Sequence, residues 1–460
     1  MKFKTTLILL VVLAGLLALV LFVLPKKPAD EAASKGPQLT DLKQEDVEQI
    51  VLNTGAETIG FKKNSEGKWL ISEPIQAKAE SYEVDTLARD FSAVQAERVV
   101  DENAQDPARY GIPKKDVTLW FKGQKEPVQF LLGNENPVDN TIYAQKKGEA
   151  RVVLLSASVK SDLEKKLFDF RQKDVFNFDT NSAQKIVVRT SGAEWQAAKK
   201  GEDWHLEKPV AGLADKFKLD SVLSALSGMR AVEFVSEQKT DKEVKAFGLD
   251  KPEVEAAVSL PAVNQDVTFR LRKKDDKIYA TTSLSNKIIR VEQQALTDLD
   301  KKPQDLREKG VDIFNAWEAD KLTVKTAALG LTVSKDKEGI WRFEAGGKGE
   351  ADLSKVESFI RQVDGLAAKE FIDKPGPLAS YGLEKPQAEV RIRVKELEQK
   401  TREVTVQVGT EDSAKKEVVV RNPKLNYLLR VDSAFLSDLP KTSKDWENPK
   451  VEKPKPGKEN

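Results

Sequence analysis

The chain has 460 residues, of which 75 are Lys or Arg and 74 are Asp or Glu, for a formal net charge of +1. It contains no Cys, one His and two Met, and 40% of its residues are hydrophobic. This composition excludes disulfides, thiol catalysis and Cys-ligated zinc or iron–sulfur sites within one chain, and it limits histidine chemistry to His205. The hydrophobic fraction is sufficient for packed cores, and at about 150 residues per domain the length predicts roughly three domains.

The N-terminal segment has the composition of a membrane anchor. Two lysines precede an unbroken apolar run of 18 residues, from 7 to 24, which is closed by Pro25 and two further lysines. A membrane span needs about 17–25 residues, whereas the core of a signal peptide has about 7–15 and ends at small residues. We therefore expect residues 1–25 to form an uncleaved transmembrane helix, with a long cleaved signal peptide as the alternative. A short arm before a single span predicts that the large body lies outside the cytoplasm.

Two flanking segments lack the residues needed for a core. Residues 26–44 begin with a stretch rich in Pro, Lys and Ala, which predicts a flexible stalk. Residues 447–460 are rich in Pro, Lys and Glu and predict a disordered tail.

Between these flanks the chain repeats one unit. Three tryptophans are 135 and 137 residues apart, three aromatic-Gly pairs are 137 and 134 apart, and three apolar strand positions are 136 and 136 apart. These landmarks are Trp69, Trp204 and Trp341; Tyr110-Gly111, Phe247-Gly248 and Tyr381-Gly382; and Ile50, Ile186 and Leu322. Because independent landmarks recur in register, we predict three tandem copies, over 45–179, 180–316 and 317–446.

Each copy has the pattern of an α+β domain. Short β-rich runs separated by Gly- and Asn-containing turns come first, and the period then changes to that of an amphipathic helix, as in Val84, Leu87, Phe91 and Val94. Strands return after the aromatic-Gly pair, and a short helix is expected around 158–168 in the first copy. The predicted fold class is α+β, with an N-terminal transmembrane helix followed by three tandem homologous repeats that contain antiparallel sheets.

The recurring residues have structural explanations. Each tryptophan ends a predicted hairpin and suits a core position, with ligand stacking as the weaker interpretation. The glycine of each aromatic-Gly pair suits a turn that needs positive φ, and Phe247 argues against a tyrosine hydroxyl in catalysis. His205 is interpreted as a surface strand residue, because Leu70 and Arg342 occupy its position in the other copies.

The chemical motifs in the sequence are weak. The matches to Ser-x-x-Lys include Ser65–Lys68 and Ser334–Lys337, which lie in predicted turns and lack the supporting elements of a Ser-Lys hydrolase. Phosphate-binding loops, EF-hand loops and zinc-protease motifs are absent from the sequence, and acidic and basic residues are mixed along it. We therefore predict no catalytic, cofactor-binding or metal-binding residues, no cofactor and no nucleic-acid partner.

The landmarks resemble a known family. Gly67-Lys-Trp69, Pro74 and Ala79, an amphipathic helix and then Tyr110-Gly111-Ile112 are similar to the pattern of the bacterial "domain of unknown function 4340" family. Copy two departs from the pattern in having Phe for Tyr, and copy three lacks the closing Arg that copies one and two carry at Arg171 and Arg307. The resemblance implies a single-span protein of the bacterial inner membrane with a periplasmic body, often encoded beside ABC-type export components, and it transfers no catalytic residue.

Two functions from different classes follow. The first is a non-enzymatic, membrane-anchored extracytoplasmic protein that serves an ABC-type transporter or an envelope assembly as an accessory or scaffold. The alternative is an envelope hydrolase that uses carboxylates or a Ser-Lys pair. A passive spacer is a third interpretation.

Overall fold

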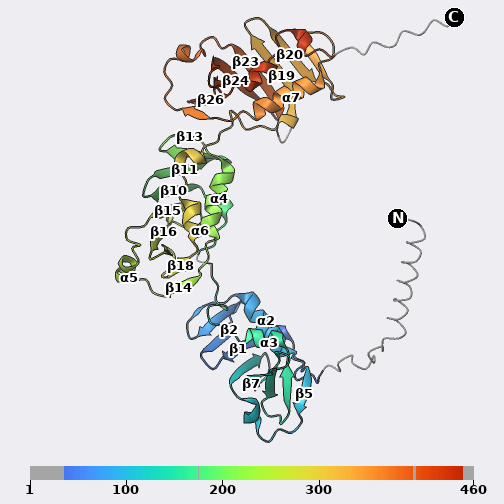
Figure 1. Cartoon of the computed structure of the whole chain (residues 1–460), viewed down its shortest axis with the longest axis vertical. Helices are drawn as coiled ribbons and strands as arrows, with labels where there is room; N and C mark the ends of the chain where they lie inside the picture. Colours follow the sequence, from blue (N-terminus) through green and yellow to red (C-terminus); the bar gives the residue numbers. More distant parts are fainter. Residues whose placement is uncertain (1–35, 175, 397–399, 449–460) are drawn as a thin grey trace, which may run out of the picture. The chain divides into compact units, whose positions relative to one another are not determined.

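The computed structural model describes residues 36–174, 176–396 and 400–448. The chain divides into two compact units, one up to residue 174 and the other from residue 175. Within the described residues, the first unit holds one sheet and the second holds two (Figure 1). These three tandem antiparallel sheets confirm the coarser part of the predicted fold, whereas the transmembrane helix expected over residues 1–25 lies outside the described residues.

The first sheet has nine strands in the order β4-β3-β2-β1-β6-β7-β8-β9-β5. Its hairpins follow one another along the chain, except that β5 crosses to the far edge. The strands are β1 (Val47–Asn53), β2 (Thr58–Lys63), β3 (Trp69–Glu73), β4 (Ala77–Lys78), β5 (Arg98–Asp101), β6 (Lys115–Phe121), β7 (Val128–Glu135), β8 (Ile142–Lys146) and β9 (Val152–Leu155).

The second sheet repeats this order as β13-β12-β11-β10-β15-β16-β17-β18-β14. Its strands are β10 (Lys185–Thr190), β11 (Glu194–Lys200), β12 (Asp203–Lys208), β13 (Gly212–Leu213), β14 (Glu233–Ser236), β15 (Val254–Ser259), β16 (Val267–Lys274), β17 (Lys277–Thr282) and β18 (Ile288–Val291).

The third sheet has eight strands in the order β21-β20-β19-β23-β24-β25-β26-β22. They are β19 (Ala319–Thr326), β20 (Gly330–Lys335), β21 (Trp341–Ala345), β22 (Glu370–Ile372), β23 (Ala388–Lys395), β24 (Thr401–Asp412), β25 (Glu417–Arg421) and β26 (Leu428–Asp432).

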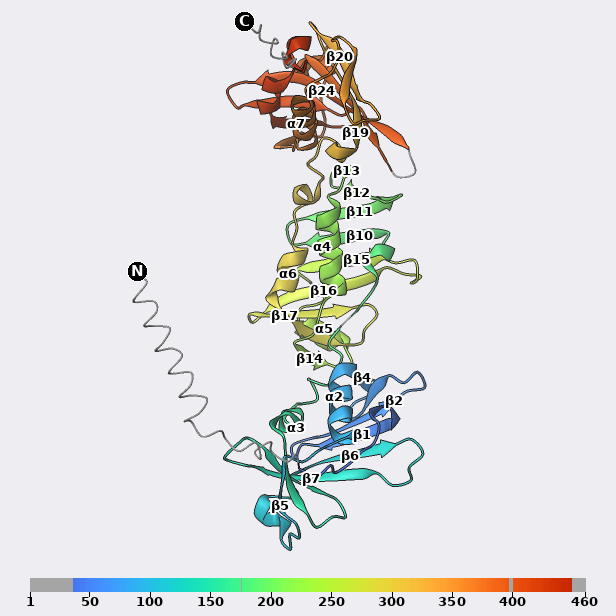
Figure 2. The same cartoon turned by 90° about the vertical axis from the view of Figure 1, so that its right-hand side faces the viewer.

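Each sheet carries one twelve-residue helix on one face: α2 (Ser81–Ser92), α4 (Lys216–Ser227) and α7 (Leu353–Asp364). Figure 2 shows α4 lying across the second sheet. The predicted stripe of α2 is confirmed, because Val84, Leu87 and Phe91 are fully buried in one core with strand residues, while Val94 is buried just beyond the helix. Burial of each such side chain contributes about 1.5–3 kcal/mol, so this face holds the helix on the sheet.

The repeats contain more sheet and less helix than the sequence predicts. The short helix expected around 158–168 is confined to α3 (Ala157–Asp162). The edge strand β5 has only four residues and pairs with β9, which comes about 50 residues later in the chain. A local hairpin pattern therefore does not predict it. Within the described residues, the remaining α-helices are the short α5 (Asp241–Ala246) and α6 (Gln293–Leu299).

The flexible stalk predicted over 26–44 does not extend to residue 44. Leu39 is buried, and its amide donates to the Val94 carbonyl at 2.9 Å. The Thr40 hydroxyl donates to the Phe91 carbonyl at 3.2 Å. Apolar and hydrogen-bonding groups at 39–42 therefore attach this segment to the end of α2, and the earlier part of the predicted stalk, 26–35, lies outside the described residues. Of the tail predicted over 447–460, Glu447 forms a bridge with Ala351, and residues 449–460 lie outside the described residues.

Candidate functional site

The three repeat tryptophans lie in the cores. Trp69, Trp204 and Trp341 are no more than 3% exposed, and a lysine from the neighbouring strand lies over each ring, at 4.9, 5.5 and 5.2 Å from the centroid. These lysines are Lys63, Lys199 and Lys335, which are each 136 residues apart. Two of the indoles also donate to a carboxylate on the main helix: Trp69 to Asp85 at 2.8 Å and Trp341 to Glu357 at 3.5 Å. The tryptophans therefore join the edge hairpin to the helix.

The aromatic-Gly pairs form turns beside the sheets. Gly111, Gly248 and Gly382 have φ of 74°, 72° and 68°, the left-handed conformation predicted for them. The Tyr110 ring lies 5.2 Å from that of Tyr143, and the Phe247 ring lies 4.7 Å from that of Tyr279. Burial raises the pKa of Tyr110, and its hydroxyl donates to Asp101 at 3.2 Å. Tyr381 packs in the corresponding small cluster of the third repeat. All these contacts are internal to the fold.

The sequence candidates for chemistry lie apart. His205 is on β12, and burial lowers its pKa, with the charge of Lys200 acting in the same direction. Lys68 pairs with Glu66 at 2.9 Å, and in the described residues no hydrogen bond joins Ser65 to Lys68 or Ser334 to Lys337. Among the residues that the structure describes, no group of three or more His, Asp or Glu side chains could hold a metal ion.

Each repeat closes in the same way. The residue that immediately precedes the main helix donates its backbone amide to the carbonyl of a buried apolar residue, at 2.8 Å in every repeat. These pairs are Glu80 and Phe170, Asp215 and Leu306, and Asp352 and Trp446. The residue that follows this apolar residue forms a β-bridge beside the edge hairpin, and these bridging residues are Arg171, Arg307 and Glu447. The third repeat therefore has a closing residue in register, and it is a glutamate where the first two have arginine.

Arg307 joins the second repeat to the third. Its guanidinium carbon lies 3.7 Å from the ring centroid of Phe371 and 4.6 Å from that of Tyr427. Its Nη1 donates to Asp373 at 2.6 Å, and the side chain is only 5% exposed. Burial raises the pKa of Tyr427, while the positive charge of Arg307 opposes this. A buried, stacked and charge-paired arginine makes this junction a specific contact.

A cleft of ≈840 Å³ lies beside this junction, and His205 is among its lining residues. Three of its charged groups pair with one another, since Arg402 reaches Asp312 at 2.8 Å and Glu396 at 2.7 Å. Lys424 donates to the Glu403 carbonyl at 3.0 Å, which is a neutral acceptor. The lining of this cleft therefore includes an internally paired cluster centred on Arg402.

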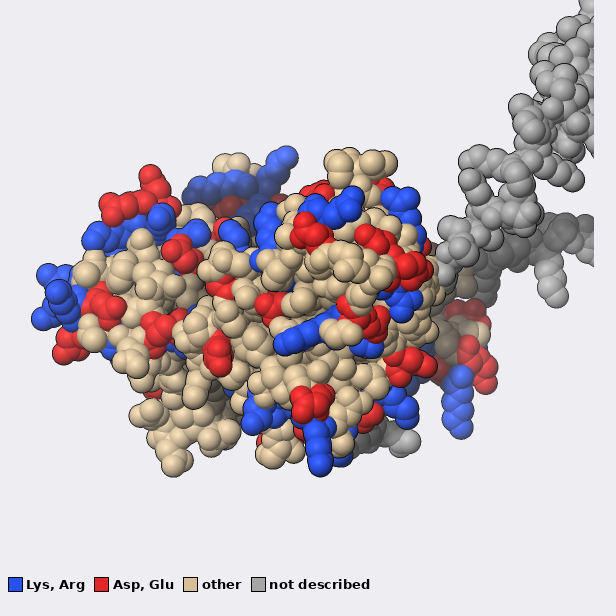
Figure 3. Space-filling view, turned by 90° about the horizontal axis from the view of Figure 1, so that it is seen from below, with Lys and Arg blue, Asp and Glu red and all other residues tan. Residues whose placement is uncertain are grey.

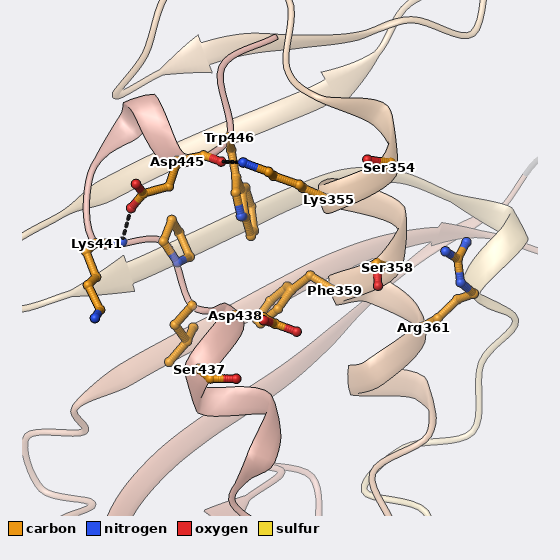
Figure 4. A pocket seen from close by; sticks show the side chains of 12 residues that line it. Ser354, Lys355, Ser358, Phe359, Arg361, Ser437, Asp438, Lys441, Asp445 and Trp446 are labelled. Carbon is orange, nitrogen blue, oxygen red and sulfur yellow. Dashed lines mark hydrogen bonds between the residues drawn. The ribbon is translucent and has the colours of Figure 1, made fainter. Parts of the chain in front are cut away.

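A second cleft, of ≈720 Å³, lies within the third repeat (Figure 4). Helix α7 forms one side, and the closing segment 437–446 forms the other, with Phe359 and Trp446 in contact at a ring distance of 5.3 Å. In the first two repeats the strand before the closing segment is followed by an α-helix, α3 or α6, whereas here it is followed by the 3₁₀-helix η9 (Ala434–Asp438).

The free groups of this cleft are mainly cationic. Lys355 donates to the Asp445 carbonyl at 2.6 Å, and the Asp445 carboxylate accepts from the amides of Lys441 and Thr442 at 2.8 Å. Asp438 accepts from Gln362. The ammonium of Lys441 has no hydrogen bond or ion pair within the described residues, so the lining has unpaired positive charge and its carboxylates are occupied.

An exposed tryptophan stands next to this cleft. Trp317, on the 3₁₀-helix η6 (Ala316–Glu318), is 71% exposed, and the guanidinium of the lining residue Arg361 lies 5.5 Å from its ring centroid. Leu353, beside the lining residue Ser354, is 52% exposed. We call the cleft together with Trp317 and Leu353 the third-repeat surface. Exposed aromatic, aliphatic and arginine side chains around a cleft are typical of a protein-binding surface.

A comparison with known protein families supports the repeat. A family model described as "Domain of unknown function (DUF4340)" matches residues 69–252, 204–374 and 341–458. The matches begin at Trp69, Trp204 and Trp341. The chain belongs to the DUF4340 family. The resemblance drawn from the sequence is thereby confirmed, and the three overlapping matches together span residues 69–458 of this DUF4340 protein.

Other comparisons with the DUF4340 protein carry no conclusion. No curated protein sequence matches it significantly. Among solved structures, a DNA polymerase sliding clamp from Pseudomonas aeruginosa with ligand is 9% identical, covers 85% of this chain and 93% of that one, and has a TM-score of 0.15. A DnaN sliding clamp from Bartonella birtlesii is also 9% identical, covers 87% and 94%, and has a TM-score of 0.15. At such TM-scores the likeness supports no argument about fold or function.

The surface of the DUF4340 protein mixes both signs of charge. On the face drawn in Figure 3, basic and acidic side chains are interspersed. In the part of the chain that the structure describes, no helix is both long and apolar enough to cross a membrane.

The sequence interpretation missed the third-repeat surface, although the sequence carries a signal for it. Trp317 occupies the position of Glu45 and Asn181, each 136 residues apart, in the short helices η2 (Gln44–Asp46) and η4 (Thr180–Ser182). A tryptophan at a position that is polar in the other copies is not needed by the shared fold. Comparison of the copies at their differences would have found it.

Proposed function

We propose that this DUF4340 protein is a non-catalytic scaffold of the bacterial envelope. In this proposal the apolar segment 7–24 holds it in the inner membrane, and its body extends outside the cytoplasm as an accessory of an ABC-type transporter or envelope assembly. The composition of the N-terminal segment and the family resemblance support the location. The observation that carries the binding role is the exposed Trp317 beside the third-repeat cleft.

The partner segment proposed for this surface carries acidic side chains. Trp317 and Leu353 offer apolar area, and Lys441 offers positive charge. Arg361 adds a guanidinium that is also paired with Glu357 at 3.9 Å. Tryptophan and arginine are the residues that most often dominate the free energy of protein association. An acidic and partly apolar segment of another envelope protein therefore complements the third-repeat surface.

The residues shared by the repeats support a scaffold. Trp341, Lys335 and Glu357 connect sheet to helix, and Arg307 connects one repeat to the next. Lys335 and Trp341 bond to Glu357, and Nη1 of Arg307 bonds to Asp373, so these contacts are made within the fold. They leave the third-repeat surface for a partner.

Affinity purification of the intact chain from detergent-extracted membranes tests the proposal. We expect a transporter permease or another envelope component to be recovered, and recovery to fall at least about fivefold with Trp317→Asn, which introduces the residue of the second copy. Leu284→Asn is the matched control, because Leu284 is 43% exposed in the second repeat. Recovery of the chain alone, or equal loss with both variants, would refute the proposal.

The hydrolase alternative has a separate test. Ser358 and Lys355 line the third-repeat cleft, and Ser437 lies on its other side. If the cleft were hydrolytic, Ser358→Ala or Ser437→Ala would abolish turnover of an envelope substrate and leave partner recovery unchanged. The scaffold proposal predicts that neither variant changes the recovery and that no turnover is lost.

A further inference from the structure

The second repeat contains a small cavity with an unusual lining. Its volume is ≈170 Å³, and its six lining residues are Lys239, Thr268, Arg270, Thr281, Thr282 and Ser283. Two are cationic, four carry hydroxyl groups, and none is acidic. The volume suits a small ion or the end of a ligand, since pockets for drug-sized molecules have about 300–1,000 Å³.

Lys239 enters this cavity without a carboxylate partner. Its ammonium donates to the Thr281 hydroxyl at 3.3 Å and to the Thr282 carbonyl at 2.5 Å, which are both neutral acceptors. An ammonium has three donors, so one remains for a further acceptor. Burial lowers the pKa of Lys239, and the positive charge of Arg270 lowers it further. An anion in the cavity would oppose both effects, because its negative charge favours the protonated form of Lys239.

Arg270 supplies further donors. Its Nε donates to Glu255 at 2.9 Å, while its two Nη atoms make no hydrogen bond among the described residues. Glu255 is itself shared with Arg189, at 3.2 Å. Arg189 also pairs with Glu194 at 3.1 Å, so Glu194 and Glu255 balance the two arginines, and Lys239 supplies the unbalanced positive charge at the cavity.

The two threonines are not the donors of this cavity. In the strand register Thr281 stands opposite Arg270, whereas Thr282 stands opposite the buried Phe269, so the Thr282 side chain lies on the core face and its carbonyl accepts from Lys239. The Thr281 hydroxyl donates to the Lys287 carbonyl at 2.9 Å. The donors that remain for a ligand are therefore those of Lys239 and Arg270.

The arrangement is particular to the second repeat. By strand register, Thr281 and Thr282 follow Ala280, and the positions after Ala144 in the first repeat hold Gln145 and Lys146. The positions after Val420 in the third repeat hold Arg421 and Asn422. The shared fold therefore does not require two threonines here.

We propose that the second repeat binds a small tetrahedral oxyanion, of the phosphate class, between Lys239 and Arg270. Charge-assisted hydrogen bonds from the Lys239 ammonium and from the Nη atoms of Arg270 hold the oxyanion. The site could receive a free ion or the phosphate end of a larger ligand. It is independent of the third-repeat surface.

Isothermal titration of the purified full-length chain with inorganic phosphate tests this inference. We expect one site per chain, competition by sulfate and no measurable binding of acetate. Lys239→Gln should weaken phosphate binding more than about tenfold, since a hydrogen bond to a charged group is lost together with the charge. Lys242→Gln, on the adjacent helix α5, is the control and should bind as the wild type does.

Arg270→Gln separates binding from folding. It removes the Nη donors from a side chain that is 44% exposed, so thermal stability should change little while phosphate affinity falls about tenfold. Added glycerol phosphate that binds more tightly than inorganic phosphate would indicate a phosphorylated ligand, and equal affinity would indicate the free ion. The inference is wrong if phosphate does not bind the folded wild-type chain, or if Lys239→Gln and Arg270→Gln bind it as the wild type does.

Discussion

Two arginine–aspartate pairs in the second unit share a distance but differ in burial. Arg307 reaches Asp373 at 2.6 Å, and Arg393 reaches Asp320 at 2.6 Å. The Arg307 side chain is 5% exposed and stacked on two rings, whereas that of Arg393 is 43% exposed. Solvent screens the second pair, so we expect it to contribute less to stability than the first, although the two distances are equal.

Replacing these arginines tests the difference. Arg307→Ala should lower the free energy of unfolding by about 2–4 kcal/mol, because it leaves Asp373 partly buried without its partner and removes the stacking on Phe371. Arg393→Ala, the matched control, should cost less than about 1 kcal/mol. Urea unfolding followed by tryptophan fluorescence measures both. Equal losses would mean that the junction contact is no stronger than a surface ion pair.

Asp364 gives a prediction with a pH dependence. It is the last residue of α7, where negative charge is unfavourable, and burial raises its pKa while an amide hydrogen bond from Ala316 opposes this. A raised folded-state pKa stabilises the fold below the unfolded value of about 3.9, and this contribution is lost as pH rises through the raised pKa. Asp364→Asn should therefore be more stable than the wild type at pH 7, by less than about 1 kcal/mol, and no more stable near pH 3. Thermal melts of the variant and the wild type at the two pH values test this prediction. A variant that is more stable than the wild type only at pH 3 would contradict it.

The sequence predicted the environment of some side chains but not the contact partners of others. The buried tryptophans and the left-handed glycines follow from residue type, because a large ring needs a core and a positive φ favours Gly. The partners of Arg307 did not follow, since Phe371, Asp373 and Tyr427 lie more than 60 residues away in the chain. Contacts between repeats have no local pattern.

The aromatic-Gly turn is the element in which glycine is most constrained. At Gly382, with φ of 68°, an added Cβ would lie 2.7 Å from the Thr410 hydroxyl and 3.2 Å from the Thr410 amide nitrogen. At Gly339, with φ of 84° in the hairpin before Trp341, an added Cβ would meet nothing within 4 Å. The two positions share the backbone strain and differ in the space available.

Alanine at these two glycines separates strain from crowding. Gly339→Ala should cost about 1–2 kcal/mol, the usual penalty for an L-residue in the left-handed region. Gly382→Ala should cost at least about 1 kcal/mol more, because the turn must also move away from β24. Equilibrium unfolding of both variants decides this, and equal costs would show that Thr410 moves aside freely.

At the level of helices and strands, the spacing of apolar residues in the sequence predicted the buried face of a helix, but it did not predict which distant segments pair. The stripe on α2 has the helical period, so its burial could be foreseen. The edge strand β5 and the attachment of 39–42 to α2 depend on segments about 50 residues away, which the period of a short window does not report. The spacing of apolar residues likewise did not predict that the helix expected around 158–168 would be confined to α3.

The closing position differs between the second and third repeats. Arg307 closes the second repeat and contacts the third, and Glu447 stands at the equivalent bridge of the third repeat. The closing bridge itself therefore does not require arginine, and the contact of Arg307 with the third repeat is an additional role of that side chain.

For the chain as a whole, the repeat could be predicted because tryptophans and glycines are under the same structural constraint in every copy. The third-repeat surface and the cavity at Lys239 could not, because they depend on residues that differ between the copies, such as Trp317 and Thr281. Features common to the copies report the fold, and features of one copy are the better guide to binding.

The most direct test of the scaffold proposal is photo-crosslinking in intact cells. A photoreactive amino acid at position 317 should form an adduct with one envelope protein, and the same amino acid at position 181, the equivalent position in the second repeat, should not. The adduct at 317 should be lost when Arg361→Glu reverses the charge of the neighbouring guanidinium. Absence of an adduct at 317, or the same adducts at both positions, would contradict a partner-binding role for the third repeat.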